Sequence, residues 1–336
     1  MRIGPHDLTQ RVLIIAEIGL NHEGDLEAAE RLIHLAAEAG VDAVKFQTLR
    51  AEHIVSAQDP EWRDIFRSLE LSFEAFGHLA AVAHEQGVSF LSTPFDEESV
   101  DFLDPLVPAF KIASGDLTAL PLVARIAEKG KPILLSTGMS DEEEIIQALD
   151  TISGAIGGAA LSERVVLLHC VSSYPTPPEQ ANLASIPFLR DRFELLVGYS
   201  DHTLGIQACE GAVALGAVAL EKHFTDCKTG RTFRDHALSA DPDDMATLVK
   251  RVRALEPMLG RYRKAPMPIE ADNRQTMRRS LATAQNITAG TVVEEGMLTV
   301  LRPATGIPPN EIEQVVGRRV ARDLARGDLV RWDDLQ

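Results

Sequence analysis

Two histidines follow the ends of two apolar segments that are neighbours in the sequence. His202 comes after the apolar residues 195–197, and His223 comes after the apolar residues 217–220. The residues between them suffice for one helix, so the pattern predicts a β-α-β unit with parallel, adjacent strands. Both imidazoles then lie at the carboxyl end of the sheet, where they can share one metal ion. A single strand-end histidine is more simply explained by a bond to a backbone carbonyl, but two in register favour a metal.

Polar side chains also end the other strand-like segments, residues 12–16, 43–48, 89–95, 109–114, 132–138 and 165–172. Read in chain order, these ends and those of the β-α-β unit carry Glu17, Lys45, Gln47, Thr93, Lys111, Ser114, Ser136, Thr137, Ser172 and Ser200. Two lysines, several hydroxyls, a carboxylate and two histidines suit a small, oxygen-rich anion bound beside a cation. The competing interpretation of the lysines is a salt bridge with a buried carboxylate, because an unpaired ammonium on an apolar strand is costly.

The order of elements predicts how these side chains meet. Eight strand segments alternate with helical segments such as residues 73–86, 121–129 and 141–153. This number of cycles within residues 1–260 is typical of an α/β fold, the (β/α)8 TIM barrel, whose active sites lie at the carboxyl ends of the strands. An open doubly wound sheet is the alternative, and the absence of a glycine-rich fingerprint after the first strand disfavours it.

The remaining segments predict loops and a second domain. The proline-rich residues 174–178 form either a wall of the site or a surface loop, and residues 227–240 form an irregular loop with Arg234 and Asp235. Residues 261–277 contain two prolines and little periodicity, which indicates a linker. Residues 286–293 then match residues 323–330 at an offset of 37, and this repeat predicts a small pseudo-symmetric β domain over residues 278–336.

Composition excludes several classes of function. The chain has 336 residues and a formal net charge of −17, so nucleic acid and anionic membranes are not expected partners. It has no apolar run of membrane-spanning length and no signal-like start, so we expect a cytoplasmic protein. The three cysteines, Cys170, Cys209 and Cys227, lack metal-binding spacing, and we expect them to be reduced and structural.

Eight ordered motifs resemble the sialic acid synthase (N-acetylneuraminate synthase) family. They are residues 16–24 (AEIGLNHEG), 44–48 (VKFQT), 92–95 (STPF), 111–116 (KIASGD), 135–139 (LSTGM), 169–177 (HCVSSYPTP), 200–203 (SDHT) and 222–225 (KHFT). The tail from Arg279 is similar to the β-clip antifreeze-like (SAF) domain of that family. The likeness covers nearly the whole chain, and the number and order of the motifs make it highly specific.

The resemblance implies condensation of phosphoenolpyruvate with an N-acetylated hexose aldehyde, typically N-acetylmannosamine, to give a nine-carbon ulosonic acid and phosphate. It implies a divalent ion, usually Mn²⁺ with Mg²⁺ as the alternative, on His202 and His223, and a Glu17 that orients metal-bound water. It also implies a dimer in which each tail caps the other chain's barrel. The substrate residues that it implies are Lys45, Thr93, Lys111, Ser114, Ser136 and Ser200 for phosphoenolpyruvate, and Gln47, Asp116, Ser172, Tyr174, Asp235 and Arg302 for the sugar.

The acceptor sugar and the chemistry leave alternatives open. Bacterial N-acetylneuraminate synthases commonly have Glu and Asn where this chain has Asp116 and Ser172, and residues 50–67 form a short segment. A legionaminate-like diacetamido sugar, or another surface-glycan or spore-coat ulosonate, is therefore also considered. A Schiff-base aldolase that uses Lys45 or Lys111 is the second enzyme class, and it needs no metal. A non-enzymatic sugar- or ice-binding protein is the third hypothesis.

Overall fold

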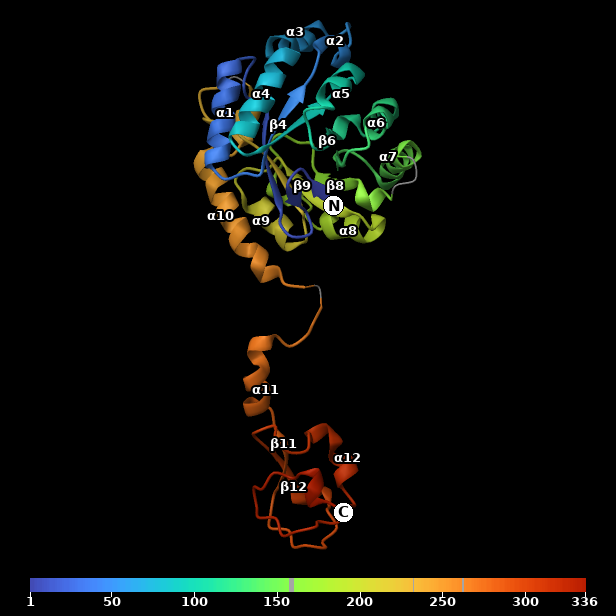
Figure 1. The fold of residues 1–336 in the computed structure, drawn as a ribbon, viewed down its shortest axis with the longest axis vertical. Coiled ribbons are helices and arrows are strands. Elements are labelled where there is room, and N and C mark those ends of the chain that lie inside the picture. The colour runs from blue at the N-terminus through green and yellow to red at the C-terminus, as the bar shows by residue number, and fades with distance from the viewer. Residues whose placement is uncertain (157–159, 232, 262) are drawn as a thin grey trace. The chain divides into compact units, whose positions relative to one another are not determined.

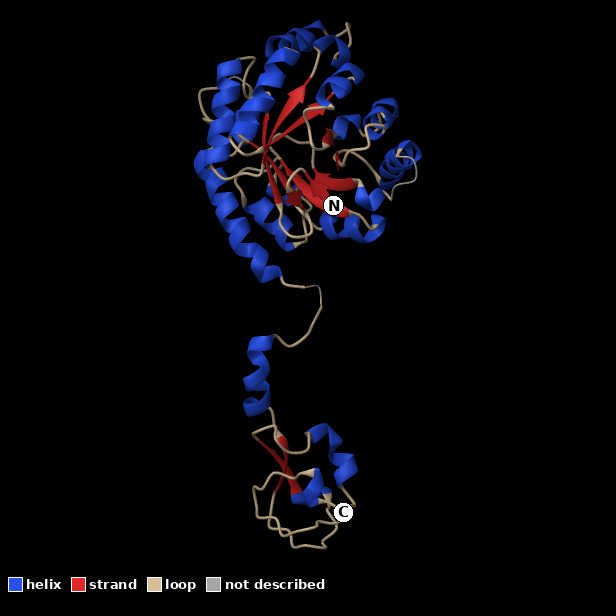
Figure 2. Cartoon of the chain, in the orientation of Figure 1, coloured by secondary structure: helices blue, strands red, loops and turns tan. Residues whose placement is uncertain are grey.

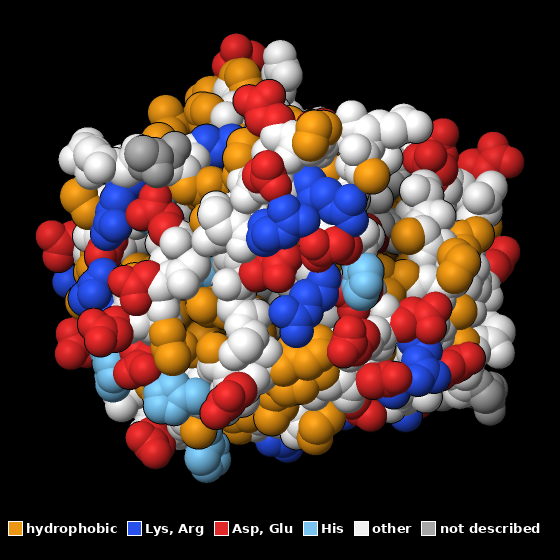
Figure 3. Space-filling model, turned by 90° about the horizontal axis from the view of Figure 1, so that it is seen from above, with side chains coloured by type: hydrophobic (Ala, Val, Ile, Leu, Met, Phe, Trp, Pro, Cys, Tyr) orange, Lys and Arg blue, Asp and Glu red, His pale blue; other side chains and the backbone are white. Residues whose placement is uncertain are grey.

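The computed structural model describes residues 1–336 except 157–159, 232 and 262. The chain divides into two compact units, Met1–Gly260 and Arg261–Gln336 (Figure 1), and each is described by itself. No helix among the described residues combines the length and the apolar character that crossing a membrane requires. On the face seen in Figure 3, acidic and basic side chains are interspersed with apolar ones.

The first unit is a barrel of eight parallel strands in the order β5-β4-β3-β10-β9-β8-β7-β6. The first of these strands in the chain, β3, is hydrogen-bonded to the last, β10, and β5 and β6 lie against each other. The predicted (β/α)8 fold is thus confirmed, and the open doubly wound sheet is wrong. The strands are β3 (Leu13–Gly19), β4 (Ala43–Thr48), β5 (Ser89–Pro94), β6 (Phe110–Ile112), β7 (Ile133–Ser136), β8 (Val165–Cys170), β9 (Leu196–Asp201) and β10 (Ala219–His223).

Helices surround the strands, as Figure 2 shows. The first of them, α1 (Leu26–Glu38), begins where the Asp25 carboxylate accepts a bond from the Glu27 backbone N–H, and its apolar residues at helical spacing are buried against the sheet. The others are α2 (Ala51–Ile54), α3 (Pro60–Leu69), α4 (Phe73–Glu85), α5 (Glu97–Leu103), α6 (Leu120–Ala127), α7 (Glu142–Ala155), α8 (Ser185–Phe193), α9 (Gln207–Ala214) and α10 (Pro242–Leu259). Helix α9 occupies the predicted position between the two histidine strands.

Alternation along each strand separates two cores. In β3, Leu13 and Ile15 belong to the core inside the barrel, whereas Ile14 belongs to the larger core between sheet and helices. The amino end of the barrel interior is closed by a hairpin that the sequence did not indicate, formed by β1 (Arg2–Ile3) and β2 (His6–Asp7). Its Ile3 is fully buried in the inner core. The inner core therefore leaves space for a ligand toward the carboxyl ends of the strands.

The second unit has its own small core. Strands β11 (Ser280–Thr283) and β12 (Leu298–Leu301) pair antiparallel, α12 spans Ile312–Val315, and α11 (Ala271–Met277) occupies part of the segment that was expected to be a linker. Residue 262 of that segment lies outside the described residues. The predicted repeat is visible at its equivalent positions: Ile287 and Leu324 exchange two backbone hydrogen bonds of 2.8 Å. Besides the four register pairs of β11 with β12, the described residues of this unit pair through isolated bridges such as that of Ala282 with Leu329.

Candidate active site

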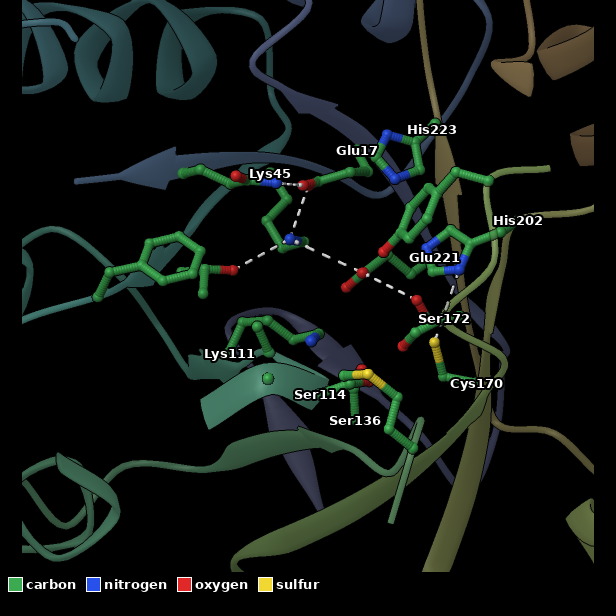
Figure 4. A pocket seen from close by; sticks show the side chains of 18 of the residues that line it. Glu17, Lys45, Lys111, Ser114, Ser136, Cys170, Ser172, His202, Glu221 and His223 are labelled. Atoms are coloured by element: carbon green, nitrogen blue, oxygen red, sulfur yellow. Dashed lines mark hydrogen bonds and ion pairs between the residues drawn. The ribbon is translucent and has the colours of Figure 1, made fainter. Parts of the chain in front are cut away.

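A cavity of about 310 Å³ opens at the carboxyl ends of the barrel strands (Figure 4). It brings together twelve of the predicted site residues, which come from all eight strands or the loops that follow them. These twelve are Glu17, Lys45, Gln47, Thr93, Lys111, Ser114, Ser136, Ser172, Tyr174, Ser200, His202 and His223. Thr137, the remaining strand-end residue, is buried and donates its hydroxyl hydrogen to the Leu168 carbonyl, so it has a structural contact of its own.

The two histidines lie side by side at the end of β9 and β10. Their ring centroids are 5.4 Å apart, and the Tyr174 ring packs 4.1 Å from the His202 ring. His202 Nδ1 is 2.8 Å from the Val171 carbonyl oxygen, the backbone contact that a structural histidine would make. Because a carbonyl oxygen only accepts, Nδ1 carries the hydrogen, so Nε2 is the ring atom that can bind a metal ion when the ring is neutral. Burial acts to lower the pKa of His202, but its contacts, chiefly that with Cys170, outweigh burial and raise that pKa above its usual value.

The donor set fits a metal ion with open positions. His223 Nδ1 is buried without a hydrogen-bond partner, and burial lowers the pKa of this histidine well below its usual value, so the ring is in its neutral, ligating form. Among the described residues no group of three or more His, Cys, Asp and Glu side chains forms a complete ligand set. A two-imidazole site of this kind leaves the other positions for water and substrate oxygens, as catalytic metal sites do.

Lys45 is the centre of a buried charge cluster. Its ammonium lies 2.7 Å from Glu17 Oε2 and 3.7 Å from Glu221 Oε1, and it donates to Thr93 Oγ1 at 3.1 Å. Lys45 therefore makes the salt bridge that was considered as the competing interpretation. The same charge cluster also lines the cavity. The Glu17 carboxylate also accepts a bond from Gln47 Nε2 at 3.2 Å.

Lys111 is different, since no ion pair to it is found in the described part of the chain. It is 3% exposed, and its Nζ donates to the Ile112 carbonyl at 2.8 Å. Burial lowers the pKa of Lys111 below its usual value. A buried ammonium without a carboxylate partner, with the unpartnered Ser136 hydroxyl lining the same cavity, is a position for an anionic ligand.

The backbone approaches the cavity closely at Gly138. Its N–H donates to Ser114 Oγ at 3.0 Å, and a Cβ at this position would lie 2.5 Å from Ser172 Oγ and 2.8 Å from Ser114 Oγ. Any larger residue would displace the two hydroxyls, so the glycine of the LSTGM motif is required by the site itself.

The two buried carboxyls differ in acidity. Burial raises the pKa of Glu17 to about 7, although Lys45 opposes the shift. Burial also acts on Glu221, but the ammonium groups of Lys111 and Lys45 bring the pKa of that carboxyl below its usual value. Glu17 can therefore bind and release a proton near neutral pH, whereas Glu221 stays ionised.

Three predicted sugar-site residues do not line the cavity. Asp116 is half-buried in the turn after β6, and burial raises its pKa to about 6. Asp235 is buried beside the exposed Arg234, whose Nε lies 3.5 Å from its Oδ1. Arg302 is exposed at the end of β12 in the second unit. The predicted roles of these three residues stay predictions.

Seven residues of the cavity lining were not assigned a role from the sequence: Phe95, Ala113, Gly115, Met139, Cys170, Glu221 and Arg234. Alternation could have found Glu221, because it is two residues before His223 and so faces the same side of β10. Cys170 was expected to be structural, but its Sγ lies 3.7 Å from His202 Nδ1 within the site. The guanidinium of Arg234 lies 5.0 Å over the Tyr174 ring. Tyr174 thus makes the proline-rich loop a wall of the site.

Comparison with known proteins agrees with this geometry. Residues 32–264 match the NeuB family and residues 278–336 match the SAF domain. The chain is 40% identical to the N,N'-diacetyllegionaminic acid synthase of Legionella pneumophila over 99% of this chain and 97% of that protein. It is 35% identical to the N-acetylneuraminate-9-phosphate synthase of Mus musculus over 96% of this chain and 92% of that protein.

A solved structure shares the fold. The N-acetylneuraminic acid (sialic acid) synthetase of Leptospira borgpetersenii, in complex with citrate, superposes with a TM-score of 0.73 at 34% identity, over 78% of this chain and 90% of that one. Together with the eight-stranded barrel and the cavity at its carboxyl end, these matches show that the chain belongs to the NeuB family of sialic-acid-type synthases and ends in a SAF domain.

Proposed function

We propose that the protein condenses phosphoenolpyruvate with an N-acetylated amino-sugar aldehyde and water, giving a nine-carbon ulosonate and inorganic phosphate. The observation that carries the proposal is the convergence of two buried lysines, several hydroxyls and two histidines on one cavity of about 310 Å³. Phosphoenolpyruvate is a small anion with a phosphate and a carboxylate, and each anionic group needs fixed donors inside an apolar barrel.

Several residues of the cavity are proposed to bind the charged groups of phosphoenolpyruvate. Lys111, with Ser114 and Ser136, supplies donors for an anion, and Lys45 supplies a second ammonium, 3.7 Å from Glu221 Oε1. As the enol carbon of phosphoenolpyruvate bonds to the aldehyde carbon, positive charge develops at carbon 2. The ionised carboxylate of Glu221 can stabilise that positive charge, and the two lysines can bind the phosphate and carboxylate of the substrate. Loss of one such fixed group typically lowers the rate by about 10²–10³.

Glu17 is proposed to accept the proton from the water that adds to carbon 2. Water adds to carbon 2 and must lose a proton before the carbon–oxygen bond to phosphate breaks. A carboxyl with a pKa of about 7 is suited to accept that proton at neutral pH. Its hydrogen bond from Gln47 and its contact with Lys45 hold the carboxylate in one orientation.

His202 and His223 would hold a divalent cation. When bound, such an ion acts as a Lewis acid toward the aldehyde oxygen of the acceptor. Two nitrogen ligands completed by oxygen favour Mn²⁺, or Mg²⁺, over zinc, which prefers three or four nitrogen or sulfur ligands.

The acceptor is proposed to be N-acetylmannosamine or a related sugar. The names of the two relatives support an amino-sugar acid as the product, and a legionaminate-type diacetamido sugar is the alternative. Purified enzyme should be assayed with phosphoenolpyruvate and a panel of hexosamines, with phosphate release followed and each product identified by mass. No phosphate release with any member of the panel, in the presence of Mn²⁺, would contradict the proposal.

The two units are proposed to work in a domain-swapped homodimer, with Arg302 of each tail reaching the barrel of the other chain. Charge supports this docking: residues 261–336 carry 12 basic and 10 acidic residues, and residues 1–260 carry 21 and 40. A slightly basic tail is attracted to a strongly acidic barrel. We also propose a cytoplasmic location, which suits the three free thiols.

A Schiff-base aldolase stays as a second candidate because of one observation. Lys111 is buried with no ion-pair partner in the described part of the chain, and burial lowers its pKa, which is the environment of an amine nucleophile. Borohydride added with substrate would trap a covalent adduct on Lys111 if this candidate were correct. The condensing enzyme would instead lose activity to chelators and form no adduct.

A further inference from the structure

Each of the two histidines follows a charged residue that is buried on the other side of its strand. Asp201 precedes His202 and Lys222 precedes His223, and Asp201 and Lys222 are register partners in the pairing of β9 with β10. Their side chains are 0% and 1% exposed, and Lys222 Nζ lies 2.8 Å from Asp201 Oδ2. Neither residue lines the cavity.

Strand alternation explains why the pair is hidden. Ser200, His202, Glu221 and His223 face the cavity, so the intervening Asp201 and Lys222 face the helix layer. There Asp201 accepts hydrogen bonds from the Tyr199 hydroxyl at 3.0 Å and from the Cys209 thiol of α9 at 3.4 Å. The pair thus ties both strands to the helix that connects them.

The same pair holds the backbone on both sides of His202. Asp201 Oδ1 accepts from the Thr203 N–H at 2.8 Å, and Lys222 Nζ donates to the Thr203 carbonyl. The His202 carbonyl is itself bonded by the Thr176 N–H at 2.9 Å. Because β9 ends at Asp201, His202 lies beyond the regular strand, where these side-chain bonds and an isolated bridge between Thr176 and Thr203 hold the backbone.

Stability alone does not account for a fully buried ion pair. Desolvation of the two charges offsets most of their attraction, and apolar replacement of such a pair is often neutral or stabilising. We propose that Asp201 and Lys222 are positioning residues that keep His202 and His223 in the register that binds a divalent cation. The inference deepens the proposed function and rests on its metal site.

The test measures Mn²⁺ binding without substrate or turnover. The double variant Asp201→Asn, Lys222→Met removes both charges at similar volume and leaves an acceptor for the Thr203 N–H. Its Mn²⁺ dissociation constant, measured by the electron paramagnetic resonance signal of free Mn²⁺, should rise by about 10–100-fold, as for other residues that orient metal ligands. Its melting temperature should stay near that of the wild type.

A matched control is the ion pair at the opposite end of the barrel. Asp42 precedes β4 and pairs with Arg253 of α10, and its Oδ2 also accepts from the Ile14 N–H at 2.8 Å. The variant Asp42→Asn, Arg253→Met should alter the melting temperature and leave Mn²⁺ affinity unchanged. This contrast separates positioning of the histidines from a general loss of stability.

Each outcome decides between the two proposals. Wild-type Mn²⁺ affinity in the Asp201, Lys222 double variant, together with lost binding in His202→Ala, overturns the positioning role and leaves the metal site intact. Unchanged binding in His202→Ala overturns the metal site itself. If the double variant does not fold, Tyr199→Phe is used instead, because it removes one hydrogen-bond donor to Asp201. Weaker Mn²⁺ binding in Tyr199→Phe than in the Asp42, Arg253 control variant supports the inference, and wild-type Mn²⁺ binding refutes it.

Discussion

Replacing Lys111 by methionine separates a substrate-binding lysine from a structural one. Lys111 is 3% exposed and has no carboxylate within ion-pair distance among the described residues, so its charge is a cost to the folded state. Methionine keeps much of the stem volume without the charge. We expect Lys111→Met to keep or raise the melting temperature and to reduce condensation by about 10²–10³.

The neighbouring lysine supplies the contrast. Lys45 lies within 4 Å of both Glu17 and Glu221, and Lys45→Met would leave two carboxylates buried without their shared partner. Breaking a buried pair in this way costs about 3–5 kcal/mol. At about 2–4 °C per kcal/mol for a domain of this size, the melting temperature should fall by roughly 6 to 20 °C. The two lysines line the same cavity from β4 and β6, and their different contacts predict opposite changes in stability.

Thermal unfolding with and without phosphoenolpyruvate is the assay. At a ligand concentration of about 100 times the dissociation constant, wild-type protein should gain about 2.7 kcal/mol of stability, and Lys111→Met should lose this gain. A melting temperature lowered by several degrees with unchanged kcat/KM would refute the reasoning and make Lys111 a structural group. The same assay on Lys45→Met controls for loss of charge in the barrel.

The pH dependence of stability is a second test of the Lys111→Met variant. Because the folded-state pKa of Lys111 is lowered, the unfolded chain binds its proton more tightly. The cost of the buried ammonium is present at low pH and is relieved as pH rises from the folded to the unfolded pKa. The stability advantage of Lys111→Met over the wild type should therefore shrink as pH rises into that window, as measured by denaturant unfolding.

Three further predictions concern the metal, the dimer and Asp116. His202→Ala and His223→Ala should each fold, contain much less Mn²⁺ when measured by atomic absorption, and lose nearly all condensation activity. Full activity of either variant after exhaustive chelation would exclude the metal role. A purified hybrid dimer of one Lys111→Met chain and one Arg302→Ala chain should recover about half of the wild-type activity if the tails are swapped, because one of its two sites is then wholly wild type. If Arg302→Ala is impaired by itself and the hybrid dimer recovers no activity, the swap is refuted. Burial raises the pKa of Asp116 from 3.8 to about 6, so the stability of the folded state falls as pH rises through this range. Asp116→Asn should therefore be more stable than the wild type at pH 7 by on the order of 2 kcal/mol but not at pH 3.5, and equal differences at both pH values would contradict this sign.

Most of the polar lining of the cavity could be predicted from the sequence because it follows the two-residue periodicity of strands. In a parallel strand every second side chain faces the same way, so a polar residue that ends an apolar strand is placed at one end of the barrel. Glu17, Lys45, Lys111 and His223 all follow this rule and line the cavity. The repeat of 37 residues likewise predicted a pseudo-symmetric β domain, in which the equivalent residues Ile287 and Leu324 pair with each other.

Only the tertiary structure decided which of these side chains are partners. Glu17, Lys45 and Glu221 come from three strands, and their contacts depend on strand register and on closure of β10 against β3. Pairing of β9 with β10 buries Asp201 against Lys222, whereas Lys111 has no ion pair among the described residues. Local sequence sets the direction of a side chain, but distances between strands far apart in the chain are set by the packing of the whole barrel. The acidity of the two buried carboxyls follows from those distances, and so it could not be predicted from the sequence alone.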